Sequence, residues 1–158
     1  MSVEACPYEV RWARLSEWEE TMAFVWNVFL TAEGKSCSEK GRKQFLDFIS
    51  DPSLKTAFEK GEYPVLLALE KERIAGMAAV RDHSHLSLLF VDEKHRMKGI
   101  GRMLTECMMQ YARSRGERFM SLYAASEAVD FYRKLKFRTI RPEEEFSGIR
   151  ITYMERFF

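Results

Sequence analysis

The segment Leu88-Leu89-Phe90-Val91-Asp92-Glu93-Lys94-His95-Arg96-Met97-Lys98-Gly99-Ile100-Gly101 decides the fold, because it joins an apolar strand to an amphipathic helix. Residues 85–91 carry apolar side chains on both alternating faces, which is typical of a strand buried inside a sheet. After the segment, apolar residues recur at helical spacing, at Ile100, Met103, Leu104, Cys107, Met108, Tyr111 and Ala112. The chain therefore passes from a buried strand to a helix through one short basic turn.

This turn has the properties of an anion-binding loop. The first turn of a helix has unpaired N–H groups and the positive end of the helix dipole, so phosphate is a suitable ligand there. Gly99 and Gly101 lack Cβ atoms, which would allow a pyrophosphate to approach the backbone. The positive charge around the turn comes from Lys94, Arg96, Lys98 and Arg102. Alternatively, the two glycines serve only to reverse the chain direction.

Length and composition predict one globular domain over residues 1–158. The chain has 158 residues, of which 46% are hydrophobic and 31% charged, enough for a packed core and a hydrated surface. Its 25 basic and 24 acidic side chains give a net charge of +1. We therefore expect no nucleic-acid partner, because such proteins carry a strong basic excess or stripe.

The cysteines and the apolar segments predict a cytoplasmic protein. Cys6, Cys37 and Cys107 are odd in number and widely spaced, which favours reduced thiols. The first residues have neither a basic nor an apolar region of the kind found in secretory signals. The most apolar stretch, Met22–Leu30, is far too short to cross a bilayer, so we expect no membrane association.

The hydrophobic pattern predicts a mixed α/β sandwich. In chain order, the expected elements are a strand at 8–15, a helix at 17–32, a helix from Ser36 or Ser38 to Pro52, a helix at 53–60, strands at 64–70, 74–81 and 85–91, the helix from Ile100, a strand at 119–124, a helix at 126–134, and strands at 138–141 and 149–155. Lys71-Glu72-Arg73 and Glu143-Glu144-Glu145 are expected to be turns.

The first helix is the most apolar of these elements. Ser16 and Glu19 have the spacing of a capping box, and Gly34 is a suitable end for the helix. Apolar side chains between Met22 and Leu30 surround nearly the whole helix. It is therefore either buried between layers or faces a partner or a substrate.

Two segments resemble the GNAT superfamily of acetyl-CoA-dependent acyltransferases. Residues 88–101 resemble the family's fourth strand and its pyrophosphate loop, Arg/Gln-x-x-Gly-x-Gly/Ala. Ala128-Val129-Asp130-Phe131-Tyr132-Arg133-Lys134-Leu135-Lys136-Phe137 is similar to the family's A-x-x-F/L-Y-x-K-x-G-F motif. Residues 148–154 also resemble the terminal strand of small bacterial members. The resemblance extends over residues 64–158 in motifs and over the whole chain in element order.

This resemblance implies a three-layer sandwich, in which helices flank a central mixed, mostly antiparallel sheet of six to seven strands. It implies acetyl-CoA as co-substrate, with no metal. The coenzyme's pyrophosphate would bind at Arg96, Met97, Lys98, Gly99, Ile100, Gly101 and Arg102. The fourth strand parts from the fifth in this family, so its pantetheine arm would pair with the backbone near Leu89, Phe90 and Val91.

The resemblance also identifies Tyr132 as the candidate general acid. A phenol with a pKa of about 10 stays protonated at neutral pH and can protonate the leaving thiolate. The alternative is that Tyr132 only packs beside Phe131 and Leu135.

The candidate general base is His85, which shares one face of its strand with Ser87 because side chains alternate. His83, Asp82 and Glu70 are nearby alternatives, and each of these residues could instead be a hydrated surface group. His83, His85 and Asp82 could also suggest a metal site, but no further ligand is evident.

Two residues depart from the family pattern. Lys136 occupies the position where the family prefers glycine, so it would have to adopt a left-handed backbone conformation. Ala125 replaces an asparagine that holds the coenzyme in many members.

We therefore expect an N-acetyltransferase that passes the acetyl group from acetyl-CoA directly to an amine of a small molecule or protein. The alternative is a noncatalytic acyl-CoA-binding or protein-interaction module with the same fold. A hydroxyl acceptor or a longer acyl group is an intermediate possibility. The sequence has no signature for the acceptor. The apolar helix near Met22–Leu30 and Phe157-Phe158 could support a homodimer.

Overall fold

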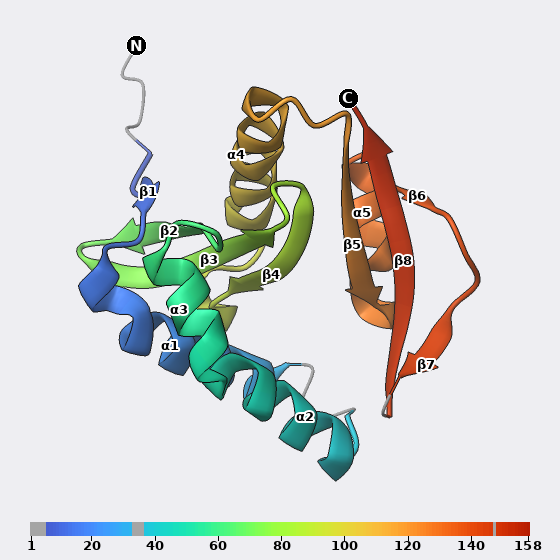
Figure 1. The fold of residues 1–158 in the computed structure, drawn as a ribbon, viewed down its shortest axis with the longest axis horizontal. Coiled ribbons are helices and arrows are strands. Elements are labelled where there is room, and N and C mark those ends of the chain that lie inside the picture. The colour runs from blue at the N-terminus through green and yellow to red at the C-terminus, as the bar shows by residue number, and fades with distance from the viewer. Residues whose placement is uncertain (1–5, 33–36, 147) are drawn as a thin grey trace.

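The computed structural model describes residues 6–32, 37–146 and 148–158, and within them the chain forms a three-layer α/β/α sandwich (Figure 1). The strands are β1 (Glu9–Trp12), β2 (Val65–Glu70), β3 (Arg73–Arg81), β4 (His85–Val91), β5 (Phe119–Ala125), β6 (Arg138–Thr139), β7 (Glu144–Phe146) and β8 (Ile149–Phe157). The helices are α1 (Trp18–Thr31), α2 (Glu39–Ser50), α3 (Pro52–Glu59), α4 (Ile100–Ser114) and α5 (Val129–Lys134), with short 3₁₀ turns η1 (Leu15–Glu17), η3 (Glu93–His95) and η4 (Ser126–Ala128).

All eight strands belong to one sheet with the order β1-β2-β3-β4-β5-β8-β6, and β7 pairs with β8. Every pair is antiparallel except β4 with β5. The expected fold class is confirmed, although the sheet has eight described strands rather than the expected six to seven. The additional strand is β7, which occupies part of the predicted acidic turn. Its three exposed residues pair with the start of β8, and no hydrophobic pattern marks so short a strand.

Two hydrophobic clusters occupy the two faces of the sheet. Helices α4 and α5 pack on one face against side chains from β2 to β5 and β8, including Met120, Leu122 and Met154. Helices α1, α2 and α3 pack on the other face, against β2, β3 and β4 only. The apolar side of α1 is therefore in the core, with Val25 and Phe29 almost completely buried.

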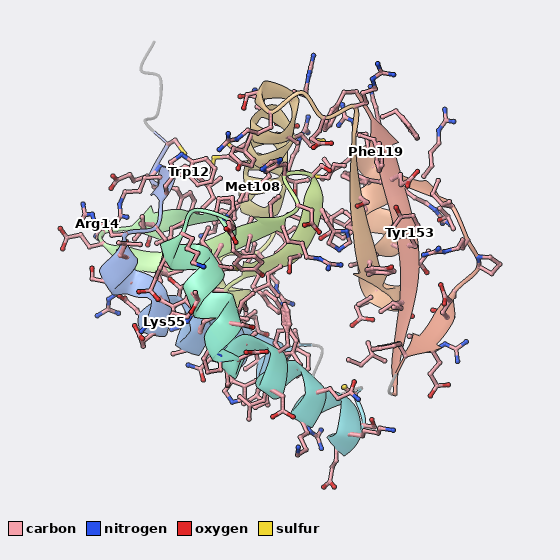
Figure 2. All side chains as sticks on the ribbon, viewed as in Figure 1. Trp12, Arg14, Lys55, Met108, Phe119 and Tyr153 are labelled. Carbon is pink, nitrogen blue, oxygen red and sulfur yellow. The ribbon has the colours of Figure 1, made fainter. Side chains whose placement is uncertain are left out.

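The coverage of the second face leaves β5 and β8 without a helix above them. No described residue of these two strands belongs to the cluster beneath α1–α3. Figure 1 shows β5 and β8 beside that helical layer rather than under it, and Figure 2 shows Tyr153 on β8 in this uncovered part of the sheet. We call this uncovered side of β5 and β8 the open face.

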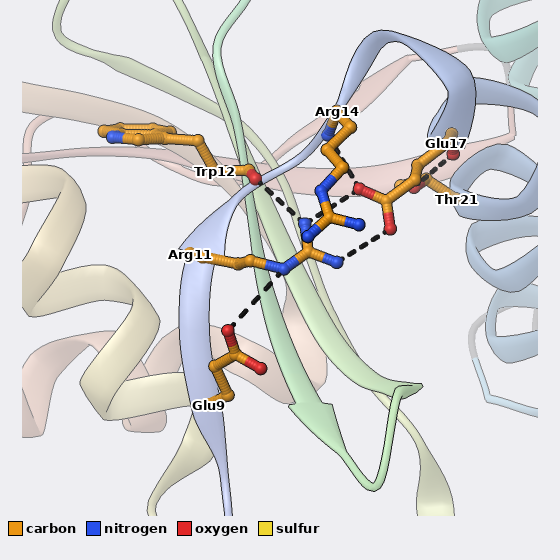
Figure 3. Close-up of polar contacts among 6 residues, drawn as sticks. All are labelled: Glu9, Arg11, Trp12, Arg14, Glu17 and Thr21. Atoms are coloured by element: carbon orange, nitrogen blue, oxygen red, sulfur yellow. Dashed lines mark hydrogen bonds and ion pairs between the residues drawn. The ribbon is translucent and has the colours of Figure 1, made fainter.

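The first helix begins differently from the prediction. Glu17, rather than Ser16, organises the turn, because its carboxylate accepts hydrogen bonds from the Arg14 N–H at 2.7 Å and from the Arg11 guanidinium at 2.8 and 2.9 Å (Figure 3). The Arg11 hydrogen bond lowers the pKa of Glu17 to about 2. The expected strand at 8–15 is also shorter, since the chain turns into η1 at Leu15. The predicted helix end at Gly34 lies outside the described residues.

The next two helices follow their capping residues. The Ser38 hydroxyl accepts a hydrogen bond from the Gly41 N–H at 3.1 Å and starts α2. Asp51 separates α2 from α3 and caps α3 through the Ser53 N–H at 2.9 Å. The other capping candidate, Ser36, lies outside the described residues.

Strand β4 contains a β-bulge that its sequence does not reveal. Ala79 pairs with Leu88 and Val80 pairs with Leu86, so Ser87 has no residue directly opposite on β3. As a result, Leu86 packs under α4, whereas Leu88 and Phe90 pack under α1 and α2. The bulge changes which face the side chains of β4 point to, immediately before the strand reaches the basic loop.

Candidate coenzyme and acyl-transfer site

The basic loop between η3 and α4 has an irregular backbone. Met97 and Gly99 both have positive φ angles, of 62° and 82°. The Met97 side chain is fully exposed, and Arg96, Lys98 and Arg102 are also exposed at the surface around the loop. The loop therefore presents its backbone and several cationic side chains to solvent.

The N-terminus of α4 is open for an anion. Gly99 is the residue that precedes the helix, and it supplies no side-chain cap, while the first turn contains no acidic residue. A Cβ atom built on Gly99 would have no neighbour within 4 Å. Free N–H groups, the positive end of the helix dipole and adjacent cations are the features that bind phosphate.

Gly101 has a different role from Gly99. A Cβ atom at Gly101 would lie 3.2 Å from Cζ of Phe131 and 3.8 Å from Cγ2 of Val91. The missing side chain makes room for α5 against α4, so Gly101 has a packing role on the side of its Cα that faces Phe131. This contact also places the neighbour of Phe131, Tyr132, close to the loop.

Strands β4 and β5 separate next to this loop. Their parallel pairing consists only of His85 with Ser121 and Leu86 with Leu122. Beyond these pairs, no described strand pairs with the β5-facing edge of β4 at Leu89, Phe90 and Val91. Asp92 follows, and its N–H is bound by the Ala75 carbonyl of β3 at 2.8 Å. We call the space between the diverging strands the strand split.

Tyr132 lies in α5, in the cluster on the α4 face of the sheet, and its side chain is 8% exposed. Its ring makes edge contacts with Phe131 and Phe137, with centroids 5.0 and 5.6 Å apart. This packing fits the structural alternative, and the contact between Phe131 and Gly101 fits the position expected of a catalytic acid.

His85 lies where β4 and β5 begin to diverge. Its Nδ1 atom is 2.8 Å from the Ser121 hydroxyl of β5. Burial, followed by the positive charge of Arg81, lowers the pKa of His85 to about 4, and Asp82 opposes this shift. His85 is therefore neutral at pH 7 and has a lone pair available. Its neighbour Ser87 hydrogen-bonds Tyr63 at 2.8 Å.

Two of the alternative base candidates, His83 and Glu70, lie against other side chains. His83 is in the turn after β3, with its Nδ1 3.8 Å from Glu117. Glu70 lies 3.6 Å from Nε2 of His95. Within the described ranges, no group of three His, Cys, Asp or Glu residues is arranged to hold a metal ion.

The structure adds a group of residues that the sequence patterns did not single out. Ser121 and Tyr123 of β5 and Tyr153 and Glu155 of β8 lie together with His85 on the open face. The ring centroids of Tyr123 lie 5.4 Å from His85 and 5.3 Å from Tyr153. The one sequence signal for this group is the weak alternation of residues 149–155. Since Met154 is in the core, the odd-numbered residues of β8 face the other side of the sheet.

A cavity of about 800 Å³ opens beside this group. It is lined by Tyr123, Arg141, Pro142, Glu143, Glu144, Phe146 and Ile151. Its charges are paired, since Glu143 binds Arg150 at 2.9 Å and Glu144 lies 3.7 Å from Arg141. Tyr123 contributes both to this cavity and to the contact with His85.

No described helix is long and apolar enough to cross a bilayer.

Comparison with known proteins identifies close architectural relatives. The model of a family described as an acetyltransferase (GNAT) domain matches residues 33–157. The uncharacterized N-acetyltransferase YobR of Bacillus subtilis is 32% identical over 130 residues, which cover 78% of this chain and 49% of that protein. The chain thus spans about half the length of this curated relative.

Solved structures show the same fold. A GCN5-related N-acetyltransferase of Rhodopseudomonas palustris superposes with a TM-score of 0.82 over 100% of this chain and 99% of its own, at 18% identity. The PaiA N-acetyltransferase of Thermoplasma acidophilum, in complex with coenzyme A, has a TM-score of 0.79 at 16% identity and covers 96% of this chain and 99% of its own. The putative acetyltransferase YncA of Salmonella typhimurium, with acetyl-CoA, has a TM-score of 0.68 at 18% identity, over 95% of this chain and 93% of its own.

Proposed function

Because this chain belongs to the GNAT acetyltransferase family, we propose that it transfers the acetyl group of acetyl-CoA directly to an amine. The observation that carries the proposal is the uncapped N-terminus of α4, which has a cationic loop on one side and the unpaired edge of β4 on the other. The coenzyme complexes of PaiA and YncA support acetyl-CoA as the donor.

The pyrophosphate binds at the loop. N–H groups of Gly99, Ile100 and Gly101 at the start of α4 point toward it, and Arg96, Lys98 and Arg102 neutralise its charge. Met97 contributes through its backbone, because its side chain points into solvent. The pantetheine arm extends along β4 and hydrogen-bonds the main chain of Leu89, Phe90 and Val91.

The chemistry requires a proton to leave the amine and another to reach the thiolate. A lysine-like amine is neutral on the order of only 0.04% of the time at pH 7, so removal of its proton assists the attack. His85 accepts this proton, since it is neutral and lies at the split. Tyr132 donates its phenol proton to the departing thiolate. The acceptor enters through the cavity that Tyr123 and Phe146 line.

Coenzyme binding is tested by charge reversal in the loop. We expect isothermal titration to give micromolar affinity for acetyl-CoA, and Lys98→Glu to weaken it about 10-fold or more, because it places a negative charge beside the pyrophosphate. Lys40→Glu makes the same change at an exposed site on α2 and is the matched control. An unchanged dissociation constant for Lys98→Glu would show that the basic loop does not bind the pyrophosphate.

Turnover is tested with an amine panel and detection of the released thiol. Tyr132→Phe is expected to lower kcat by about 10²- to 10⁴-fold with little change in coenzyme affinity, since only the proton donor is lost. Equal turnover by the wild-type protein and the Tyr132→Phe variant would show that Tyr132 only packs in the core. Coenzyme binding without thiol release on any amine would favour a noncatalytic binding module.

A further inference from the structure

The open face contains a row of hydrogen-bonded side chains that crosses three strands. His85 of β4 stands opposite Ser121 of β5, and Ser121 stands opposite Glu155 of β8. His85 Nδ1 lies 2.8 Å from the Ser121 hydroxyl. Ser121 acts on the Tyr153 phenol as a hydrogen-bond donor that lowers its pKa. Tyr153 in turn donates to Glu155 Oε2 at 2.5 Å. The row begins at the strand split and ends at a partly exposed carboxylate.

The chemistry of the groups fixes the direction of these hydrogen bonds. The Glu155 carboxylate can only accept, so the Tyr153 phenol donates to it. The Tyr153 oxygen then accepts from Ser121, and the Ser121 oxygen accepts from Nδ1–H of His85. This order assigns the proton of the neutral imidazole to Nδ1. It leaves Nε2 as the atom with the free lone pair.

From this order we propose that Ser121, Tyr153 and Glu155 form a proton relay that makes Nε2 of His85 the base for the acceptor amine and conducts the proton to solvent. This proposal rests on the acetyltransferase function proposed above. It assigns positioning and proton-transfer roles to three residues outside the coenzyme loop.

The transfer is balanced at every step. As the amine nitrogen bonds the acetyl carbon, its proton moves to Nε2 of His85, while the Nδ1 proton moves to Ser121. The Ser121 hydroxyl proton moves to Tyr153, and the phenol proton moves to the Glu155 carboxylate. The thioester C–S bond breaks, and the thiolate takes its proton from Tyr132. Glu155 then loses its proton to solvent, and Tyr132 regains one from solvent. The imidazole exchanges its Nε2 proton for one at Nδ1 through solvent, and the Ser121 and Tyr153 hydroxyls rotate, which restores the starting state.

The relay explains how a weakly basic imidazole can serve here. Burial and Arg81 disfavour the protonated ring. In a relay the ring gains one proton as it loses another, so imidazolium does not accumulate. Tyr153 is held in place by the Arg141 guanidinium, 4.4 Å from its ring centre, and by the Tyr123 ring. Burial, and then the hydrogen bond to Glu155, raise the pKa of Tyr153, which keeps the phenol protonated between transfers.

The kinetic test compares hydroxyl deletions inside and outside the relay. Tyr153→Phe and Ser121→Ala are each expected to lower kcat about 10- to 100-fold, with acetyl-CoA affinity unchanged. The double variant should lose no more than the worse single variant, because one break already interrupts the row. The control Tyr111→Phe deletes a phenol on α4, where the ring contacts Trp12, and should keep the wild-type kcat.

Raising the pH provides a readout that a purely structural role would not change. More of the amine is then already neutral, so the kcat defect of Tyr153→Phe should shrink toward the wild-type value at high pH. A defect of constant size at every pH, or additive losses in the double variant, would assign these residues to structure and overturn the relay.

The tautomer of His85 can be measured without any substrate. Nitrogen-15 chemical shifts of the intact protein at neutral pH should show His85 protonated at Nδ1. Protonation at Nε2 would overturn the relay even in an active enzyme. Wild-type protein that releases no thiol with any amine would overturn the acetyltransferase function, and the relay with it, whereas wild-type kcat in Tyr153→Phe would overturn the relay alone.

Discussion

A substitution at Gly76 would test how the fold positions the basic loop and the start of α4. This glycine lies in β3, directly beneath the first turn of α4. A Cβ atom at this position would lie 2.8 Å from Cγ2 of Ile100, 3.2 Å from Cδ1 of Leu104 and 3.3 Å from the Phe90 carbonyl oxygen. Carbon atoms ordinarily pack about 3.5–4.0 Å apart, so a methyl group here is about 1 Å too close to Ile100.

The substitution Gly76→Ala therefore forces a movement at the start of α4. Ile100 is 1% exposed, and its β-branched side chain strongly prefers one rotamer in a helix, so it cannot turn aside. Overpacking of this kind costs about 1–3 kcal/mol. For a chain of this size, a loss of about 2 kcal/mol corresponds to a fall in Tm of about 4–8 °C.

The same movement should weaken coenzyme binding. Ile100 is the first residue of α4, so displacing it moves the N–H groups that face the basic loop. A misalignment that costs about 1.4 kcal/mol raises the Kd for coenzyme A about 10-fold. Thermal unfolding measures the first effect, and isothermal titration at a temperature where the variant is folded measures the second.

Gly116→Ala is the matched control. Gly116 follows the other end of α4 with a φ of 83°, and a Cβ atom there would meet nothing within 4 Å. Alanine at this angle should cost about 1–2 kcal/mol through backbone strain alone. We expect it to lower Tm and leave the Kd unchanged. Equal weakening of coenzyme binding by both variants would refute the idea that the packing of Gly76 against Ile100 positions the coenzyme site. A Gly76→Ala protein with wild-type Tm and Kd would refute it as well.

Two further predictions concern stability. Lys136 has a φ of 71°, which strains a residue with a Cβ, so Lys136→Gly should raise stability by about 1 kcal/mol in urea unfolding; a lower midpoint would show that contacts of the lysine outweigh the strain. Folding lowers the pKa of His85 from 6.5 to about 4, so the unfolded chain binds this proton first as the pH falls. Stability should therefore decline between about pH 6.5 and 4, by about 1–3 kcal/mol given partial solvation of the ring, and His85→Gln should reduce this decline in urea unfolding at a series of pH values.

Local patterns were sufficient for much of the chain. The strand at 85–91, the basic loop and the helix from Ile100 are contiguous, and their boundaries agree with the structure. Capping by Ser38 and the left-handed backbone of Lys136 also follow from neighbouring residues and are confirmed. The family assignment is confirmed as well, because both motifs that carry it lie within short continuous segments.

Other features depend on contacts between elements, which the pattern within each segment does not show. The bulge at Ser87 exists only in the pairing of β4 with β3, and β7 forms only because β8 offers a partner. The start of α1 depends on Arg11, whose guanidinium reaches Glu17 across the turn. The capping propensity of Ser16 does not show that Glu17, held by Arg11, takes over the role at the start of this helix.

The sequence by itself determined the start of α4, where a glycine precedes the helix directly after a basic turn, since these groups are adjacent in the chain. Only the tertiary structure decided which side chains lie near the start of α4 and along the neighbouring strands. The register of β4, β5 and β8 joins His85 to Ser121, Tyr153 and Glu155, and the missing Cβ of Gly101 admits Phe131 against α4. Strand register and helix packing are set by cores that many distant residues build together, so no local pattern specifies them.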